Sequence, residues 1–155
     1  MTSVYHTPVL LEESVRLLDI DPAGTYVDLT FGGGGHSRRI LSALGDRGRL
    51  YAFDQDRDTR DNCPEDSRFH YVESNFRFMR GALRLRGVTR VDGILADLGV
   101  SSHHFDAVER GFSFRGSAPL DMRMNQRGGG TAADLVNTLD ADALTLSLIH
   151  ISEPT

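Results

Sequence analysis

The amino-acid sequence predicts an α/β fold built on a parallel sheet, and three observations lead to that prediction. Short apolar runs alternate with longer amphipathic segments, which is the pattern of successive βαβ units. Four consecutive glycines, residues 32–35, closely follow the first apolar run. Each apolar run also ends in an acidic or polar residue, as strands do when their carboxyl ends face a ligand in an open parallel sheet.

The first four expected elements come from the amino-terminal third of the chain. An amphipathic helix is expected over residues 8–18, because apolar residues recur there at helical spacing behind a proline. A first strand over residues 25–30 leads through the glycines into a helix over residues 36–44, which a following glycine ends. Residues 49–53 form the second expected strand.

The same alternation continues in the next third. Residues 56–66 allow a short helix, and residues 68–73 form the third expected strand. A helix is expected over residues 76–86 and a fourth strand over residues 91–96. Three consecutive apolar residues, 94–96, are typical of a strand that is buried on both faces in a complete sheet.

The last third has a different pattern. Residues 105–130 are rich in glycine, arginine and phenylalanine, and they predict an ordered loop. Residues 131–143 predict a helix that Thr131 opens. Residues 144–151 run or alternate apolar, unlike the helical pattern before them. Residues 147–155 resemble a translated sequencing adapter rather than a protein terminus.

Composition indicates a soluble globular domain of ordinary length. The chain has 155 residues, of which 39% are hydrophobic and 25% are charged. No apolar run approaches the ~20 residues of a membrane span, and we expect neither a membrane segment nor a secretory signal. A single cysteine, Cys63, leaves no intrachain disulfide and favours a reducing, cytoplasmic compartment.

The basic residues are unusual in kind and in distribution. The net charge is −5, which argues against a strongly basic nucleic-acid binder, and all 17 basic residues are arginines. Arginine suits bidentate contact with phosphate and stacking on bases, although genome base composition also explains its use. Residues 75–90 contain no acidic residue, which fits either a solvated helix face or a patch that faces RNA. The arginines of this segment are Arg77, Arg80, Arg84, Arg86 and Arg90.

The glycine run indicates a nucleotide-cofactor loop, because a backbone without Cβ atoms turns tightly and approaches a ligand closely. No Lys-Ser or Lys-Thr follows it, which excludes a P-loop. The dinucleotide pattern G-x-G-x-x-G requires a small residue where Ser37 stands. The D-x-G-x-G-x-G arrangement of S-adenosylmethionine methyltransferases fits better, from Asp28 to Gly34 with Thr30 in the first glycine position. A glycine-rich turn without a ligand is the alternative.

Candidate ligand-binding side chains follow the other strands. Asp54 ends the second strand 20 residues after Gly34, where an acid typically accepts hydrogen bonds from ribose hydroxyls, and Asp56 competes for that role. Phe76, after the third strand, can pack on an adenine ring or in the core. Asp97 follows the fourth strand. No second histidine or cysteine stands at metal-ligand spacing from the histidine at position 36, so we expect no metal.

Five motifs occur in order from about residue 5 to residue 140. They are H-T-P-V-L-L from His6, T-F-G-G-G-G-H-S from Thr30, D-L-G-V-S-S from Asp97, E-R-G-F-S-F-R from Glu109 and P-L-D-M-R-M from Pro119. Together they resemble the bacterial family that methylates the exocyclic amine of a cytidine in small-subunit ribosomal RNA.

The resemblance implies S-adenosyl-L-methionine as the cofactor and small-subunit ribosomal RNA as the partner. It implies a partial Rossmann-like methyltransferase fold with strand order 3-2-1-4-5, in which the fourth strand lies inside the sheet of the whole protein. In this chain, which lacks the fifth strand, the fourth strand is expected to form an open edge. His104 stands where the family usually has glutamine. The implied cofactor residues are Gly34, Gly35, His36, Asp54, Phe76, Asp97 and, at that variant position, His104.

Asp97 is the candidate catalytic residue, because an acceptor beside an exocyclic amine makes the nitrogen lone pair more available. Candidate RNA contacts are the hydroxyl of Ser101 and side chains that suit stacking and phosphate binding. Those side chains are Arg110, Phe112, Phe114 and Arg115. They fit equally well as residues that hold their loop together.

The resemblance divides the chain into three parts. Residues 1–104 form the cofactor-binding half, residues 105–146 form a substrate-side loop and the start of a helical insertion, and residues 147–155 form a non-family tail. It also implies a longer protein, so this chain is expected to be an inactive fragment. An NAD-dependent oxidoreductase and a non-catalytic nucleotide-binding remnant are the alternatives.

Overall fold

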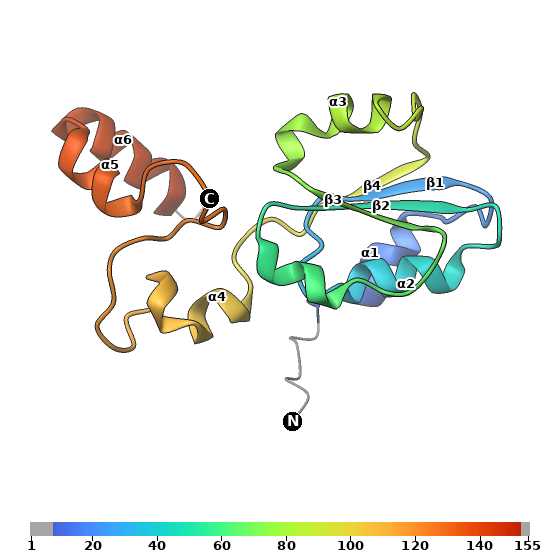
Figure 1. Cartoon of the computed structure of the whole chain (residues 1–155), viewed down its shortest axis with the longest axis horizontal. Helices are drawn as coiled ribbons and strands as arrows, with labels where there is room; N and C mark the ends of the chain where they lie inside the picture. The colour runs from blue at the N-terminus through green and yellow to red at the C-terminus, as the bar shows by residue number, and fades with distance from the viewer. Residues whose placement is uncertain (1–7, 153–155) are drawn as a thin grey trace. The chain divides into compact units, whose positions relative to one another are not determined.

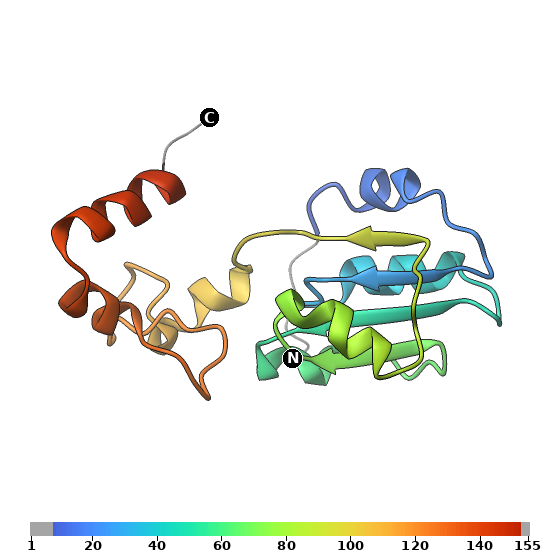
Figure 2. The same cartoon turned by 90° about the horizontal axis from the view of Figure 1, so that it is seen from above.

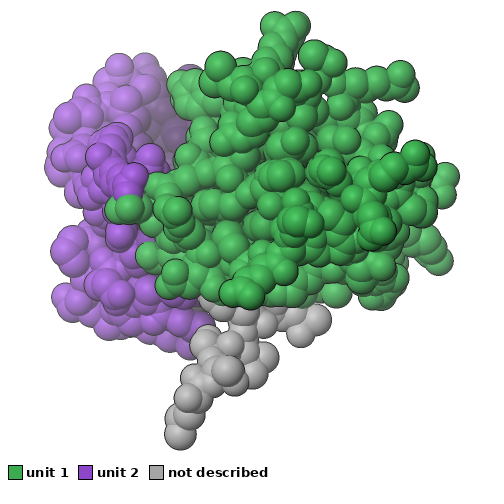
Figure 3. Space-filling model, turned by 45° about the vertical axis from the view of Figure 1, so that its right-hand side comes forward, with its two compact units in different colours: residues 1–101 green, residues 102–155 purple. Residues whose placement is uncertain are grey.

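A computed structural model of the chain describes residues 8–152, so His6 and Thr7 of the first motif lie outside the described residues. The chain forms two compact units, Met1–Ser101 and Ser102–Thr155 (Figure 3). No helix among residues 8–152 is long and apolar enough to cross a membrane.

The first unit is a four-stranded parallel sheet with the order β3-β2-β1-β4 (Figure 2). This order confirms the one that the resemblance implies for the first four strands. Each strand lies within or one residue beyond its expected range. The strands are β1 (Thr25–Asp28), β2 (Arg49–Asp54), β3 (Phe69–Glu73) and β4 (Gly93–Leu95).

Helices cover both faces of this sheet (Figure 1). α1 (Leu11–Leu17) and α2 (Gly35–Ala43) lie together on one face, and α3 (Met79–Arg84) lies on the other. Two short 3₁₀ helices, η1 (Arg57–Asn62) and η2 (Phe76–Phe78), follow β2 and β3.

Two expected helices are shorter in the structure than their sequence pattern. The helix expected from residue 8 begins at Leu11, because Leu10 has a left-handed backbone with φ of 53°. The helix expected over residues 76–86 divides into η2 and α3, and it ends before Gly87, whose φ is 77°.

Alternate side chains of the central strands fill two cores, as expected for strands buried on both faces. Tyr26 and Leu50 pack with α1 and α2, whereas Val27 and Phe53 pack in the core that also holds Leu83 of α3. Together these cores fix the sheet between its helices. The loops that follow the strands lie at the ends of the strands, outside the two cores.

β4 lies at an edge of the sheet, as expected for a chain that lacks a fifth strand. Among the described residues it pairs with β1 alone. Leu95 is buried, whereas Ile94 is 44% exposed. The edge position explains this exposure, because no further strand covers that side of β4 in the described part of the chain.

The second unit is helical around a long loop. Thr131 opens α5 through a capping box with Asp134, as its position predicts. The helix expected over residues 131–143 divides, because Leu139 has an extended backbone after α5. The helices of this unit are α4 (Ser102–Asp106), η3 (Val108–Arg110), α5 (Ala132–Thr138) and α6 (Ala141–Ser152).

Two further expectations for this unit are corrected. The loop expected from residue 105 begins later, because α4 and η3 occupy the segment up to Arg110. The segment 144–151, whose pattern departs from that of the helix before it, nevertheless lies within α6. The carboxylate of Asp140 accepts a hydrogen bond from the Ala143 backbone N–H at 2.8 Å, which starts α6.

The edge position of β4 predicts fast hydrogen exchange in this strand of the 155-residue chain. An open edge leaves backbone groups unpaired and templates association, so we expect marginal solubility as well. Exchange measured by mass spectrometry will show weaker protection in β4 than in β2, which is paired on both sides. A monodisperse monomer with strong protection in β4 would contradict this prediction.

Candidate functional site at the carboxyl edge of the sheet

The loops that follow the four strands are tied together at one edge of the sheet. The Asp97 backbone N–H after β4 donates to the Thr30 hydroxyl after β1 at 2.7 Å. The Gly32 backbone N–H donates to the Asp54 carboxylate at 2.9 Å, and the Ser74 N–H donates to the Asp54 carbonyl at 2.8 Å. The parallel strand ends therefore form a single bonded edge, where ligands of such sheets bind.

Asp28 anchors the loop that follows β1. Its carboxylate is fully buried and accepts hydrogen bonds from the Ser37 hydroxyl at 2.7 Å and the Thr30 N–H at 3.0 Å. Burial raises the pKa of the Asp28 carboxyl above its ordinary value, and the hydrogen bond from Ser37 opposes that rise. Ser37, which breaks the dinucleotide pattern, is thus the residue that links α2 to the end of β1.

The glycine run needs its glycines for their backbone conformation. Gly32 has φ of +50°, and among residues 8–152 a Cβ atom placed there would meet only the Thr30 carbonyl, at 3.9 Å. Gly34 has φ of +77° at the start of α2, and its Cβ would lie 2.9 Å from the Phe31 ring. Both positions favour glycine, and the space that the described residues leave beside Gly32 allows a ligand to approach its backbone closely.

Asp54 is held in one orientation by backbone donors. Its two carboxylate oxygens accept hydrogen bonds from the Gly32 N–H and the Asp56 N–H, each at 2.9 Å. A carboxylate has about four acceptor sites, and both of its oxygens are oriented here by backbone donors. Asp56 is buried, and its side chain caps η1 by accepting from the Asp58 N–H at 3.1 Å. The structure therefore gives the two competing acids different local roles.

His36 lies in the first turn of α2 and is only 6% exposed. Among residues 8–152, no hydrogen-bond partner is found for its buried Nε2 atom. An unsatisfied buried polar atom costs about 1–3 kcal/mol, so a partner from a bound molecule fits this position. No group of three or more metal-binding side chains is found in the same described region.

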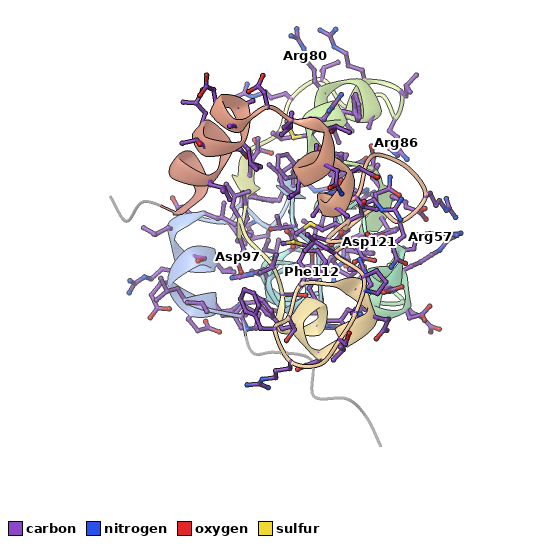
Figure 4. All side chains as sticks on the ribbon, turned by 90° about the vertical axis from the view of Figure 1, so that its left-hand side faces the viewer. Arg57, Arg80, Arg86, Asp97, Phe112 and Asp121 are labelled. Atoms are coloured by element: carbon purple, nitrogen blue, oxygen red, sulfur yellow. The ribbon has the colours of Figure 1, made fainter. Side chains whose placement is uncertain are left out.

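Phe76 and Asp97 complete the carboxyl edge with side chains that solvent reaches. Phe76 is 40% exposed at the start of η2 and belongs to neither core, so its ring can contact a ligand. Asn75 caps η2 and donates to the Gln55 side chain at 2.8 Å. Asp97, labelled in Figure 4, has an exposed side chain on a backbone that Thr30 holds.

In the second unit, Arg110 holds the long loop from inside. It is 3% exposed, and its guanidinium donates to the carbonyls of Arg123 at 3.0 Å and Met124 at 3.2 Å. Arg123 in turn pairs with Asp121 at 2.7 Å, which lowers the pKa of Asp121 to about 2. Two of the sequence motifs thus form one folded loop, and Arg110 organises it.

The remaining candidates of this unit differ in exposure. His104 is buried, and its ring lies 4.9 Å from the ring of Phe112, which is half-buried. Phe114 and Arg115 are exposed, and Ser101 at the end of the first unit is half-buried. The two exposed side chains are the ones that a polynucleotide can reach without rearrangement of the loop.

Comparison with known proteins adds a family to this geometry. A family model described as "MraW methylase family" matches residues 3–154. Three curated relatives share one printed name, "Ribosomal RNA small subunit methyltransferase H". The relative from Bacteroides fragilis is 61% identical over 142 residues, which are 92% of this chain and 47% of the relative.

The other two relatives have similar identity and coverage. The protein from Phocaeicola vulgatus is 62% identical over 141 residues, which are 91% of this chain and 46% of the relative. The protein from Porphyromonas gingivalis is 57% identical over 152 residues, which are 97% of this chain and 49% of the relative. The chain spans about half the length of the curated relatives it matches.

The buried carboxyl of Asp28 predicts a specific dependence of stability on pH. Its folded-state pKa is raised above its ordinary value of 3.8, so the folded protein holds this proton more tightly than the unfolded chain does. The free energy of unfolding should therefore fall as pH rises from about 3.8 through the folded-state pKa. Urea unfolding across this range will show a shallower fall in Asp28→Asn than in the wild type.

Ser37→Ala is the matched comparison for this measurement. It removes a hydrogen bond that favours the charged carboxylate, so the folded-state pKa of Asp28 should rise further. The fall in the free energy of unfolding should then begin at the same pH but become larger. An identical pH dependence in the wild type and both variants would contradict the role given to Asp28.

Proposed function

The chain belongs to the MraW methylase family, and we propose that the whole protein transfers a methyl group from S-adenosyl-L-methionine to the N4 amine of a cytidine in small-subunit ribosomal RNA. The observation that carries this proposal is the bonded carboxyl edge, in which the loop after β1 holds Asp54 and Asp97 in place. Support also comes from relatives named for methylation of ribosomal RNA of the small subunit.

The residues at this edge fit the proposed cofactor. Asp54 offers fixed carboxylate oxygens to the ribose hydroxyls, and Phe76 offers an exposed ring to the adenine. His36 offers a buried nitrogen atom for which the described residues hold no partner, beside the backbone of Gly34 and Gly35. When bound, S-adenosyl-L-methionine supplies an electrophilic methyl group on a sulfonium ion.

Asp97 is proposed to act on the accepting amine. The lone pair of a cytosine exocyclic amine is delocalised into the ring, so the nitrogen is a weak nucleophile. A carboxylate that accepts a hydrogen bond from this amine makes the lone pair more available. The backbone of Asp97 is held by Thr30, which limits the positions that its carboxylate reaches. Alignment of this kind supplies ~7–11 kcal/mol in well-oriented systems.

The RNA side of the reaction is proposed to use exposed residues of the second unit. A base must leave its stack before its amine can react. Phe114 and Arg115 are exposed and suit stacking and phosphate contact. Arg110 and Phe112 support this loop from within, and Ser101 is proposed as a further contact.

Two alternatives to a methyltransferase receive different support from these observations. An NAD-dependent oxidoreductase has no support from the family to which the chain belongs. A nucleotide-binding chain without activity of its own fits the 155 residues taken alone, since they span about half of each relative. We therefore propose that this chain binds the cofactor weakly. For the whole protein we propose activity in the cytoplasm, on the small ribosomal subunit.

Asp54→Ala should weaken cofactor binding more than Asp56→Ala in the whole protein. Loss of a charged acceptor costs about 1.5–3 kcal/mol, which is roughly a 10- to 150-fold loss of affinity. Loss of the η1 cap by Asp56→Ala should instead lower stability by about 1 kcal/mol. Titration calorimetry with S-adenosylhomocysteine and thermal unfolding measure the two effects. A greater loss of affinity in Asp56→Ala would reverse the assignment.

The proposed reaction is tested by labelled methyl transfer to small ribosomal subunits, followed by nucleoside analysis for N4-methylcytidine. Asp97→Asn should lower the rate at saturating cofactor by roughly 10- to 100-fold, because it weakens a charged acceptor. The affinity for S-adenosylhomocysteine should change little if Asp97 acts on the amine. Absence of N4-methylcytidine with the wild-type protein would overturn the proposed reaction, and an equal loss of affinity would place Asp97 at the cofactor instead.

A further inference from the structure

Five arginines on and around α3 form an exposed surface of one charge, the α3 basic surface. All five side chains are exposed, and residues 74–91 contain no acid, although the chain as a whole carries a net charge of −5. The local charge is therefore opposite in sign to that of the chain. The members of this surface are Arg77, Arg80, Arg84, Arg86 and Arg90.

The packing of α3 holds this surface outward. Leu83 is buried against the sheet, and Met79 and Ala82 pack around the same core. Arg80 and Arg84 are four residues apart, so they share a flank of the helix that does not enter that core. Figure 4 shows Arg80 extending away from the ribbon.

The arginines of this surface differ from others in the chain in their lack of acidic partners. Arg39 pairs with Glu12, Arg68 with Asp66 and Arg123 with Asp121, at 2.6–3.0 Å. Within the described part of the chain, none of the five α3 arginines lies within 4.0 Å of an acidic oxygen. Like charges four residues apart destabilise a helix by a few tenths of a kcal/mol, so folding does not explain this arrangement.

An aromatic side chain is interleaved with these charges. Phe78 is 54% exposed, and the guanidinium carbon of Arg77 lies 4.6 Å from the centre of its ring. Guanidinium groups bind phosphates in bidentate geometry and stack on bases, and exposed aromatic rings stack on unpaired bases. A membrane-surface helix needs a free apolar face, whereas the apolar face of α3 packs in the core.

We propose that the α3 basic surface binds the phosphodiester backbone of single-stranded RNA, along a path that leads from the carboxyl edge of the sheet over α3. This inference rests on the proposed function, because it assigns a second contact surface to the same RNA substrate. η2 begins at that edge directly after β3, and α3 continues from it along the face of the sheet (Figure 1). The surface therefore extends the site rather than standing apart from it.

The test compares two double variants of the whole protein that remove equal charge. Arg80→Gln with Arg84→Gln removes two members of the surface, and Arg16→Gln with Arg47→Gln removes two exposed arginines elsewhere. Binding of a fluorescein-labelled single-stranded RNA is followed by anisotropy over a range of salt concentrations. Thermal unfolding and S-adenosylhomocysteine affinity verify that both variants fold.

The expected result is a loss confined to the α3 variant. Each phosphate contact in single-stranded nucleic acid contributes about 0.7 to the salt slope, so loss of two contacts should reduce the slope by about 1.4 and weaken binding roughly 20-fold at about 0.1 M salt. The charge-preserving pair Arg80→Lys and Arg84→Lys should retain most of the affinity. Unchanged binding in the glutamine variant, or an equal loss in the control variant, would overturn the inference.

Two further measurements distinguish RNA binding by this surface from membrane binding and from methyl transfer itself. Binding to phosphatidylserine vesicles is measured by sedimentation. If vesicle binding depends on Arg80 and Arg84 and RNA binding does not, the inference is overturned in favour of a membrane surface. Methyl transfer is measured in parallel. Normal transfer with unchanged RNA affinity in the α3 glutamine variant would defeat this inference alone. Absence of transfer by a wild-type protein whose RNA binding depends on the α3 basic surface would defeat only the proposed reaction and leave the surface assignment in place.

Discussion

The buried carboxylate of Asp28 is the constraint on which the candidate site depends. A carboxylate removed from water is costly unless it is hydrogen-bonded, and here the Ser37 hydroxyl and the Thr30 N–H supply the bonds. These two bonds join the end of β1 to the start of α2 across the glycine run. The loop between them then presents the Thr30 hydroxyl to the Asp97 N–H and the Gly32 N–H to Asp54. A single buried acid thus sets the positions of two exposed or half-exposed ones.

The second unit repeats this division between residues that hold a loop and residues that a ligand can reach. Arg110 is buried and bonded to backbone carbonyls, and Gly111 follows it with φ of 75°, where a Cβ atom would lie 2.5 Å from the Pro119 carbonyl. The motif around these residues therefore reflects loop architecture as much as chemistry. Phe114 and Arg115 are exposed, and they are the residues of this loop proposed to contact RNA.

Arginine serves two different purposes in this chain. Arg39 and Arg68 form ion pairs with acids, and Arg110 satisfies backbone carbonyls in the interior of a loop. The arginines of the α3 basic surface have no such acidic partners among the described residues. The same residue type thus stabilises one part of the molecule and leaves another open for recognition.

The sequence by itself determined the α/β class, the positions of the four strands and the glycine loop, because these follow from local periodicity and turn chemistry. The strand order came from the family resemblance, and the structure confirmed it. Only the tertiary structure decided the division of α5 from α6, the burial of Arg110 and the role of Ser37. Those outcomes depend on partners that packing brings together, such as Thr30 and Asp97, which are 67 residues apart in the chain. Spacing along a sequence reports which face a residue occupies, but not which distant atom it meets there.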